Sequence, residues 1–280
     1  MTMRATIACL LFIALTATVR AEDDAAELAK KLSNPVASLI SVPLQSNVDF
    51  GIGPEDAYRY TLNIQPVIPI ELNSDLNLVV RTILPVIYQE VPVKGGDDES
   101  GLGDITQTFF LSPKEPVGGW TLGVGPAFLW PTSTNDALAG GKWGAGPSLL
   151  LLQQRNGWTY GFLANHLWSY ADSTSDEHPD VNATFIQPFL SYQFKTATTV
   201  GVNTESTYDW EEKQWSVPVN LFLSQVVKIG GHPTSFSVGG RYYADGPDGG
   251  PEWGLRATVT LLFPQKHSTP IQETSGYSKK

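Results

Sequence analysis

Four arginines stand in stretches where polar and apolar side chains alternate along the chain. Arg59 lies in "AYRYTLNI" and Arg256 lies in "LRATVTLLF". Because successive side chains of a strand point to opposite faces, each arginine shares a polar face with the residues two positions away. The same parity places acidic residues and a lysine on polar faces. The candidates for a charged lining are Arg59, Arg81, Asp104, Lys142, Glu205, Arg241 and Arg256.

A charged lining of this kind could perform either of two tasks. Rings of charged side chains in a pore select solutes by sign and size. In a sealed interior, the same arginine and acidic groups would pair and fill a small barrel. The sequence leaves both interpretations open.

Catalysis is a weaker hypothesis. His166 is the only histidine inside a strand-like stretch, and an esterase would need a serine within hydrogen-bond reach of it. Ser169 has the opposite parity on the same strand, so such a serine would have to come from another strand. We therefore predict no enzyme, no catalytic residue and no cofactor.

Two acidic segments, Asp97 to Glu99 and Asp176 to Asp180, could supply oxygen ligands to a divalent cation. Neither matches a calcium-binding loop of about 12 residues. His178 and His232 have no other imidazole or thiol at metal-ligand spacing. A solvated acidic surface is the favoured interpretation, and no metal site is predicted.

The elements that must position the charged candidates are strands. From about residue 35 onward no helical period is found, and alternating runs of about 10 to 15 residues are each closed by a turn signal. We count about twelve such runs, the last of which is "EWGLRATVTLLFP". In that run Leu255, Val259 and Phe263 share an apolar face, while Arg256, Thr258 and Thr260 share a polar one.

The connections between these runs fall into two alternating sets. One set, which includes "KGGDDES" and "DGPDGGPE", carries a charge of about −14, and the other, which includes "QQRNG" and "KTAT", carries about +1. Such alternation is typical of an outer-membrane barrel with an even number of strands and both termini on the short-turn side. Trp120 and Trp130 share a face and span roughly 33 Å along a strand, which fits the two aromatic girdles of a tilted barrel strand.

Six prolines argue against regular strands, because a closed barrel has no edge strand to tolerate them. We expect them at bulges or bends. They are Pro66, Pro85, Pro126, Pro147, Pro188 and Pro218.

The two ends of the chain have separate assignments. Residues 1–21 read as a secretory signal peptide, with an apolar stretch of about 11 residues that is too short to span a bilayer. Residues 22–34 are expected to form a short periplasmic helix, because acids precede lysines and leucines lie four apart. Residues 35–264 form the predicted barrel, and residues 265–280 form a polar tail.

Several classes of protein are disfavoured. The net charge of −10 argues against a nucleic-acid partner. The single cysteine, Cys9, lies in the predicted signal peptide, so disulfides cannot stabilise the remaining chain. A secreted soluble β-sandwich stays open as an alternative, and it would need a second sheet to cover each apolar face.

The chain contains several long motifs, which include "YRYTLNIQPVIPI", "GLGDITQTFF", "NTESTYDW" and "RYYADGPDGGPEWGLRATVTLLFP". These motifs resemble a known family of predicted outer-membrane proteins, described as the MetA-pathway of phenol degradation and often labelled "transporter" or mislabelled neuromedin U. The resemblance covers roughly Asn34 to Pro264. It implies an outer-membrane β-barrel with a role in transport and offers no catalytic residues. Family members typically stop after the "LLFP" strand, whereas a polar tail follows here.

We therefore expect an outer-membrane channel or transporter for small solutes, hydrophobic or aromatic ones among them. The alternative is a sealed structural or ligand-binding barrel. The expected partners are outer-membrane lipid and lipopolysaccharide, small-molecule solutes and the barrel assembly machinery, with no nucleic acid.

Overall fold

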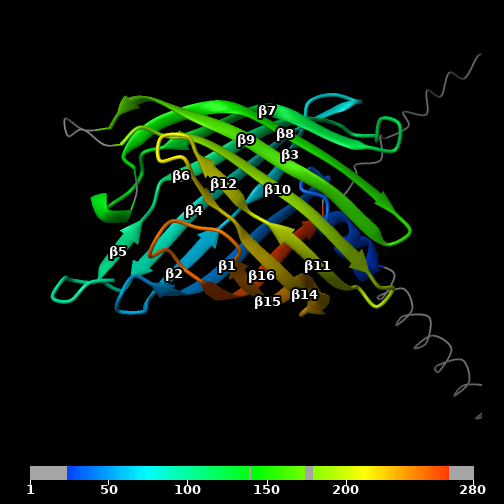
Figure 1. The fold of residues 1–280 in the computed structure, drawn as a ribbon. Helices are drawn as coiled ribbons and strands as arrows, with labels where there is room; N and C mark the ends of the chain where they lie inside the picture. Colours follow the sequence, from blue (N-terminus) through cyan, green and yellow to red (C-terminus); the bar gives the residue numbers. More distant parts are fainter. Residues whose placement is uncertain (1–23, 139, 174–178, 265–280) are drawn as a thin grey trace, which may run out of the picture.

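The computed structural model describes residues 24–138, 140–173 and 179–264. They form a closed antiparallel barrel of twelve strands with one short helix at the N-terminus (Figure 1). The barrel closes because β1 pairs with β16, and β10 pairs with both β11 and β12. The predicted all-β fold is confirmed. The predicted signal peptide, 1–21, and the predicted tail, 265–280, lie outside the described residues.

The barrel wall consists of sixteen strand segments, because four of the twelve barrel strands are interrupted once. The interrupted strands are β2 with β3, β5 with β6, β11 with β12, and β13 with β14. The first eight segments are β1 (Leu39–Ile52), β2 (Ala57–Ile64), β3 (Val67–Glu71), β4 (Leu76–Gln89), β5 (Glu99–Leu102), β6 (Ile105–Pro113), β7 (Thr121–Trp130) and β8 (Lys142–Arg155). The other eight are β9 (Trp158–Asp172), β10 (Asn182–Gln193), β11 (Thr198–Thr204), β12 (Ser206–Asp209), β13 (Gln214–Ser216), β14 (Pro218–Ile229), β15 (His232–Tyr243) and β16 (Trp253–Pro264).

The two ends of the barrel differ, as the connections predict. At the turn end, strands join through short segments such as 156–157 and 230–231, and the described chain both begins and ends there (Figure 1). At the loop end, longer segments such as 90–98 and 244–252 join the strands, and a 3-10 helix, η1 (Asp136–Leu138), lies in one of them. In outer-membrane barrels in general, the short turns are the periplasmic ones.

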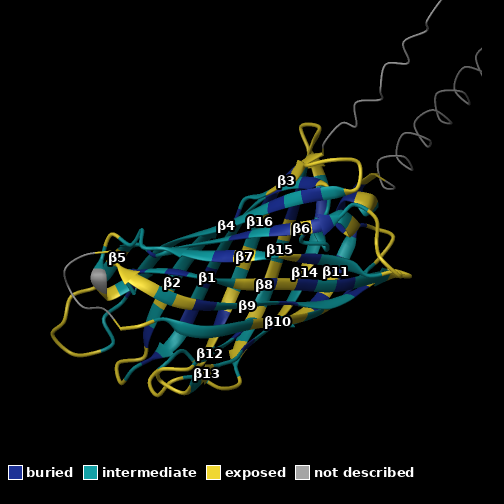
Figure 2. Ribbon diagram, turned by 90° about the horizontal axis from the view of Figure 1, so that it is seen from above, coloured by how far each residue is buried: buried dark blue, intermediate teal, exposed yellow. Residues whose placement is uncertain are grey.

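Exposed residues alternate with less exposed ones along strands such as β15 and β16, seen as alternating colours along the ribbons in Figure 2. Leu255, Val259 and Phe263 point outward and are 36–55% exposed, whereas Thr260 is 5% exposed and points into the barrel. The outer surface is therefore apolar, and the hydroxyl and guanidinium groups lie inside. Since a closed sheet pairs its backbone groups, such a surface can face hydrocarbon.

Aromatic rings gather near both ends of the outer surface. At the loop end Tyr208 packs against Trp210 and Trp215, with ring centroids 4.8 and 5.0 Å apart. At the turn end Tyr192 packs against Trp158 and Phe194 at 4.9 and 5.0 Å. Amphipathic rings prefer the interfacial depth of a bilayer, so these clusters mark the two girdles.

The prolines lie where the strands are irregular. Pro66 separates β2 from β3, and Pro218 begins β14 directly after the β13 segment. Pro126 of β7 and Pro147 of β8 lie opposite each other. The ladders from β7 to β6 and from β8 to β9 are each interrupted next to these two residues. Because proline has no N–H to donate, the breaks leave no backbone donor unpaired at these positions.

Among the described residues, no helix is long and apolar enough to cross a membrane.

Candidate functional site

The interior of the barrel holds a layer of paired charges near its loop-end half. Arg256 donates through Nη1 and Nη2 to the two carboxylate oxygens of Glu205, at 2.9 and 2.7 Å. Arg241 lies 3.3 Å from Asp49 and 3.8 Å from Glu205. All four side chains are at most 21% exposed. Asn47 accepts from Arg256 Nε at 2.7 Å, so three charge-assisted hydrogen bonds hold the guanidinium group of Arg256.

A local break in the wall positions Glu205. It stands between β11 and β12, and its own N–H donates to the carbonyl of Pro218 instead of pairing with β10. On β10, pairing passes from Phe189 with β11 to Ile186 with β12, and the two residues between them are Gln187 and Pro188. Since Pro188 has no N–H, the interruption leaves no hydrogen-bond donor of this residue unpaired. The bulge between β11 and β12 directs the carboxylate of Glu205 inward.

Two further arginines in the same layer are held by amides. Arg59 Nε donates to the amide oxygen of Gln89, and Arg81 Nη2 donates to that of Gln65 at 3.2 Å. No carboxylate of the described chain lies within ion-pair distance of either guanidinium. Arg81 still interacts electrostatically with Glu205, which belongs to the diametrically opposite barrel strand. The charged layer therefore reaches across the lumen.

Asp104 and Lys142 do not join this layer. Lys142 begins β8 at the loop-end rim, where it forms ion pairs with Asp172 at 2.6 Å and Asp180 at 3.1 Å. Asp104 lies between β5 and β6 and accepts the backbone N–H of Ser133 at 3.0 Å. Both residues tie loops to the wall. Of the seven candidates, the structure brings together Arg59, Arg81, Glu205, Arg241 and Arg256.

Sequence reasoning missed an apolar wall inside the barrel. Val79, Phe110 and Leu150 are 0% exposed and point inward. They form a cluster with Val36, Leu152 and Leu163, against which Phe185 and Phe189 pack. We expected a polar lumen, but the apolar run "SLLLL" at residues 148–152 lies on β8. In a strand, every second residue of such a run points inward, which is the signal that could have revealed this wall.

The lumen consequently has two different sides. Apart from Lys142 and Asp172 at the rim, the inward side chains of β6 to β10 carry no charge. The charged layer belongs to the other wall, which runs from β11 through β16 and β1 to β4.

A cavity of about 280 Å³ lies between the charged layer and the turn end. Arg256, Thr258 and Thr260 line it from the polar wall, and Leu163 and Phe189 line it from the apolar wall. Ser224, Ser235, Ser237, Asn203, Asn220 and Gln65 contribute further polar lining. The cavity is large enough for one small molecule.

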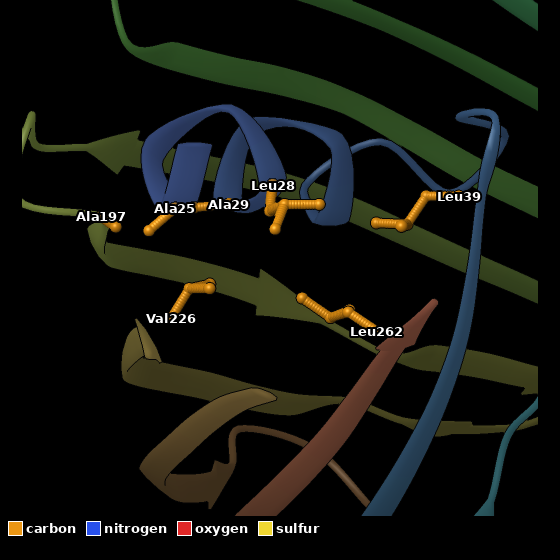
Figure 3. Close-up of a cluster of buried hydrophobic side chains, with 7 residues drawn as sticks. All are labelled: Ala25, Leu28, Ala29, Leu39, Ala197, Val226 and Leu262. Atoms are coloured by element: carbon orange, nitrogen blue, oxygen red, sulfur yellow. The ribbon is translucent and has the colours of Figure 1, made fainter. Parts of the chain in front are cut away.

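The N-terminal helix, residues 24–32, lies inside the barrel at its turn end and packs against the wall (Figure 3). Its Ala25, Leu28 and Ala29 pack against inward-facing residues of the wall, among them Val226 and Leu262. We predicted a helix at 22–34 in the periplasm. The structure has the helix at 24–32, and its apolar stripe is buried inside the barrel mouth.

Among the described residues, few polar contacts hold this helix. Gln193 Nε2 donates to the carbonyl of Ala26 at 2.6 Å, and Gln154 Nε2 donates to that of Lys30 at 2.9 Å. Asp24 and Lys228 form one ion pair at 3.0 Å, and both side chains are at least 35% exposed. Exposed pairs of this kind contribute about 0–1 kcal/mol.

The residues considered for catalysis do not meet. His166 shares the outward parity of Trp168, and its ring centroid lies 4.0 Å from the tryptophan ring. Its Nδ1 is 2.7 Å from Thr184 Oγ1. Ser169 Oγ donates instead to Asp180 at 3.2 Å. No group of three or more potential metal ligands occurs in the described part of the chain. Asp176, Glu177 and His178 lie outside that part.

Residues 55–268 match the family model described as "Putative MetA-pathway of phenol degradation". The chain belongs to this family. The fold is similar to the COG4313 outer membrane channel from Pseudomonas putida F1, with a TM-score of 0.62 and 13% identity over 80% of this chain and 94% of that one. The NanC porin matches with a TM-score of 0.48 at 11% identity, over 79% of this chain and 98% of that one. At such identities the likeness concerns the fold, which is that of outer-membrane barrels. No relative is found among curated proteins.

Proposed function

We propose that this family member is an outer-membrane channel for small solutes, hydrophobic or aromatic ones among them. The observation that carries the proposal is the lumenal cavity of about 280 Å³, which has an apolar wall on one side and hydroxyl, amide and guanidinium groups on the other. A cavity that offers both apolar surface and convergent polar groups is typical of a site for a small molecule. The export and membrane location predicted from the sequence belong to this proposal.

Passage through the barrel requires the helix to move. A small apolar cluster, two glutamine side chains and one exposed ion pair hold the helix at the turn end among the described residues. These contacts are few compared with those of a strand in the wall, so the helix can leave the mouth while the barrel stays closed.

A sealed barrel is the second candidate. It is favoured by the charged layer, in which Glu205 pairs with Arg256 and interacts with Arg81 across the lumen. Such groups can fill an interior without conducting anything.

A reversible cross-link between the helix and the barrel wall can distinguish a channel from a sealed barrel. The double variant D24C/K228C places two thiols where the ion pair stands, and no other cysteine follows Cys9 in the chain. A short bis-methanethiosulfonate joins the thiols, and conductance in planar bilayers is recorded before and after reduction.

For a channel we expect the cross-link to lower conductance several-fold and the reductant to restore it. The single variants D24C and K228C, treated with the same reagent, serve as controls and should conduct as the unmodified protein does. If the reduced double variant conducts no ions and takes up no benzyl alcohol into liposomes, the barrel is sealed.

A further inference from the structure

The lumenal layer carries an excess of positive charge although the whole chain has a net charge of −10. Its cations are Arg59, Arg81, Arg241 and Arg256, and its anions are Asp49 and Glu205. Glutamine side chains orient the first two arginines but cannot neutralise them. The layer therefore lacks two negative charges.

An uncompensated charge in a partly desolvated interior is costly unless an opposite charge approaches it. Guanidinium groups bind carboxylates well, because their N–H donors match the two carboxylate oxygens. Arg81 has one hydrogen bond among the described residues, to Gln65, which leaves further N–H donors for an anion. A carboxylate is the simplest group that would satisfy both the charge and the donors.

Part of the charged layer lines the cavity, and Arg81 itself lies behind the lining residue Gln65. Arg256 and Gln65, the acceptor for Arg81, line the cavity together with Leu163 and Phe189 of the opposite wall. A ligand here would direct a charged end toward the arginines and lay an apolar body against the leucine and phenylalanine. Neither a neutral hydrocarbon nor a strongly polar ion would use both sides.

We propose that the cavity binds small organic anions with an apolar body, of the class of aromatic or short aliphatic carboxylates. The carboxylate lies toward Arg81 and Arg256, and the body lies against the apolar wall. This inference rests on the proposed channel function and names its substrate class. A cation of the same shape is repelled by the excess guanidinium charge.

The experiment compares benzoate, benzyl alcohol and benzylammonium, which share a ring and differ in charge. The full chain is reconstituted in liposomes at neutral pH, uptake of each compound is measured, and the reversal potential is recorded in a potassium chloride gradient. We expect benzoate to enter about tenfold faster than benzylammonium, the factor that one charge-assisted hydrogen bond supplies. The reversal potential should indicate preference for chloride.

Variants at Arg81 test the assignment. R81Q removes the charge without breaking an ion pair, and it should abolish most of the preference for benzoate, whereas R81K should retain it. R155Q is the matched control, because Arg155 is exposed at the end of β8 and points away from the lumen. Heat-modifiable migration on gels verifies that each variant is folded.

The outcomes distinguish this inference from the channel proposal. If the protein conducts no ions in any form, the channel proposal is wrong. If it conducts but admits benzylammonium as fast as benzoate, or if R81Q and R155Q behave alike, the channel stands and the carboxylate site is wrong. Calorimetric binding of benzoate that is lost in R81Q, without uptake, would support the site in a sealed barrel.

Discussion

Glu205 is the residue on which the charged layer depends. It is the bidentate partner of Arg256 and lies 3.8 Å from Arg241. The exchange E205Q removes the negative charge and leaves two guanidinium groups with Asp49 as their remaining carboxylate. Removing one partner of a buried ion pair leaves the other charge buried and unpaired. We therefore expect a loss of about 3–5 kcal/mol in the free energy of unfolding. Urea denaturation in micelles, followed by tryptophan fluorescence, measures this loss.

The matched control is E55Q. Glu55 lies 3.9 Å from Lys94 in an exposed pair, with side chains 40% and 86% exposed, and its removal should cost about 0–1 kcal/mol. Equal effects of the two substitutions would show that the lumenal pairs are as well solvated as those on the surface.

Asp98, in the loop-end segment 90–98, has a perturbed carboxyl group. Its Oδ2 accepts a hydrogen bond from the Tyr88 hydroxyl at 2.6 Å, and its Oδ1 accepts the N–H of Val91 at 3.1 Å. These bonds, the first above all, lower the pKa of Asp98 below its ordinary value. The carboxylate therefore stabilises the loop above the unfolded pKa of about 3.9, and this stabilisation is lost as the pH falls through the lower folded value.

Carbon-13 NMR of labelled aspartate carboxyl groups can follow this titration. In the wild-type protein Asp98 should titrate below pH 3.9, and the Y88F exchange should raise its midpoint. An unchanged midpoint in Y88F would rule out the tyrosine as the cause.

At the level of elements, the ladder interruption beside Pro126 depends on a neighbouring glycine. A Cβ added to Gly125, beside Pro126, would lie 1.8 Å from the carbonyl oxygen of Phe109 on β6. A methyl group cannot fit there without moving the backbone, so G125A should lower stability by about 1–3 kcal/mol. Urea midpoints in micelles give the comparison.

G240A is the control for this prediction. Gly240 is exposed on β15, and an added Cβ would meet no atom within 4 Å. Its substitution should change the free energy of unfolding by no more than about 0.5 kcal/mol. A large effect at both positions would indicate a general intolerance of glycine replacement instead of a close approach between β6 and β7.

At the level of the whole molecule, the outward leucines distinguish a membrane barrel from a soluble sheet. Leu223 is 51% exposed in the middle of β14. If hydrocarbon surrounds it, L223R should cost about 2–4 kcal/mol in a lipid bilayer. In a soluble protein the same surface exchange would stay within about 0.5 kcal/mol. Refolding titrations in lipid vesicles measure the difference.

I229R is the corresponding control at the end of the same strand. Ile229 is 56% exposed at the turn end, where an arginine can reach the headgroups, so the cost should fall to about 0–1 kcal/mol. Equal costs at both depths would argue against a bilayer around the barrel.

Much of the architecture could be predicted because it depends on local periodicity. Alternation along "LRATVTLLF" fixes which side chains share a face, and it assigned Arg256 and Leu255 to opposite sides correctly. The number of barrel strands and the difference between the two ends follow from turn signals and loop charge. The helix at 24–32 was also predicted, from its end charges and leucine spacing.

Contacts between distant strands could not be predicted in this way. Parity assigns a side chain to a face but says nothing of its height or its neighbours. It therefore could not separate Lys142, held at the rim by Asp180, from Arg81, which faces Glu205 across the lumen. Nor could it show that Leu150 and Phe110 would meet Val36 inside the barrel.

The sequence by itself determined the strands, the two faces of each strand and the asymmetry between the barrel ends, because these follow from neighbouring residues along one chain. Only the tertiary structure decided that the lumen has a charged and an apolar side, and that the N-terminal helix enters it. Closure of the sheet sets strands β4 and β11 opposite each other. The periodicity within one segment cannot predict which distant strand lies opposite it.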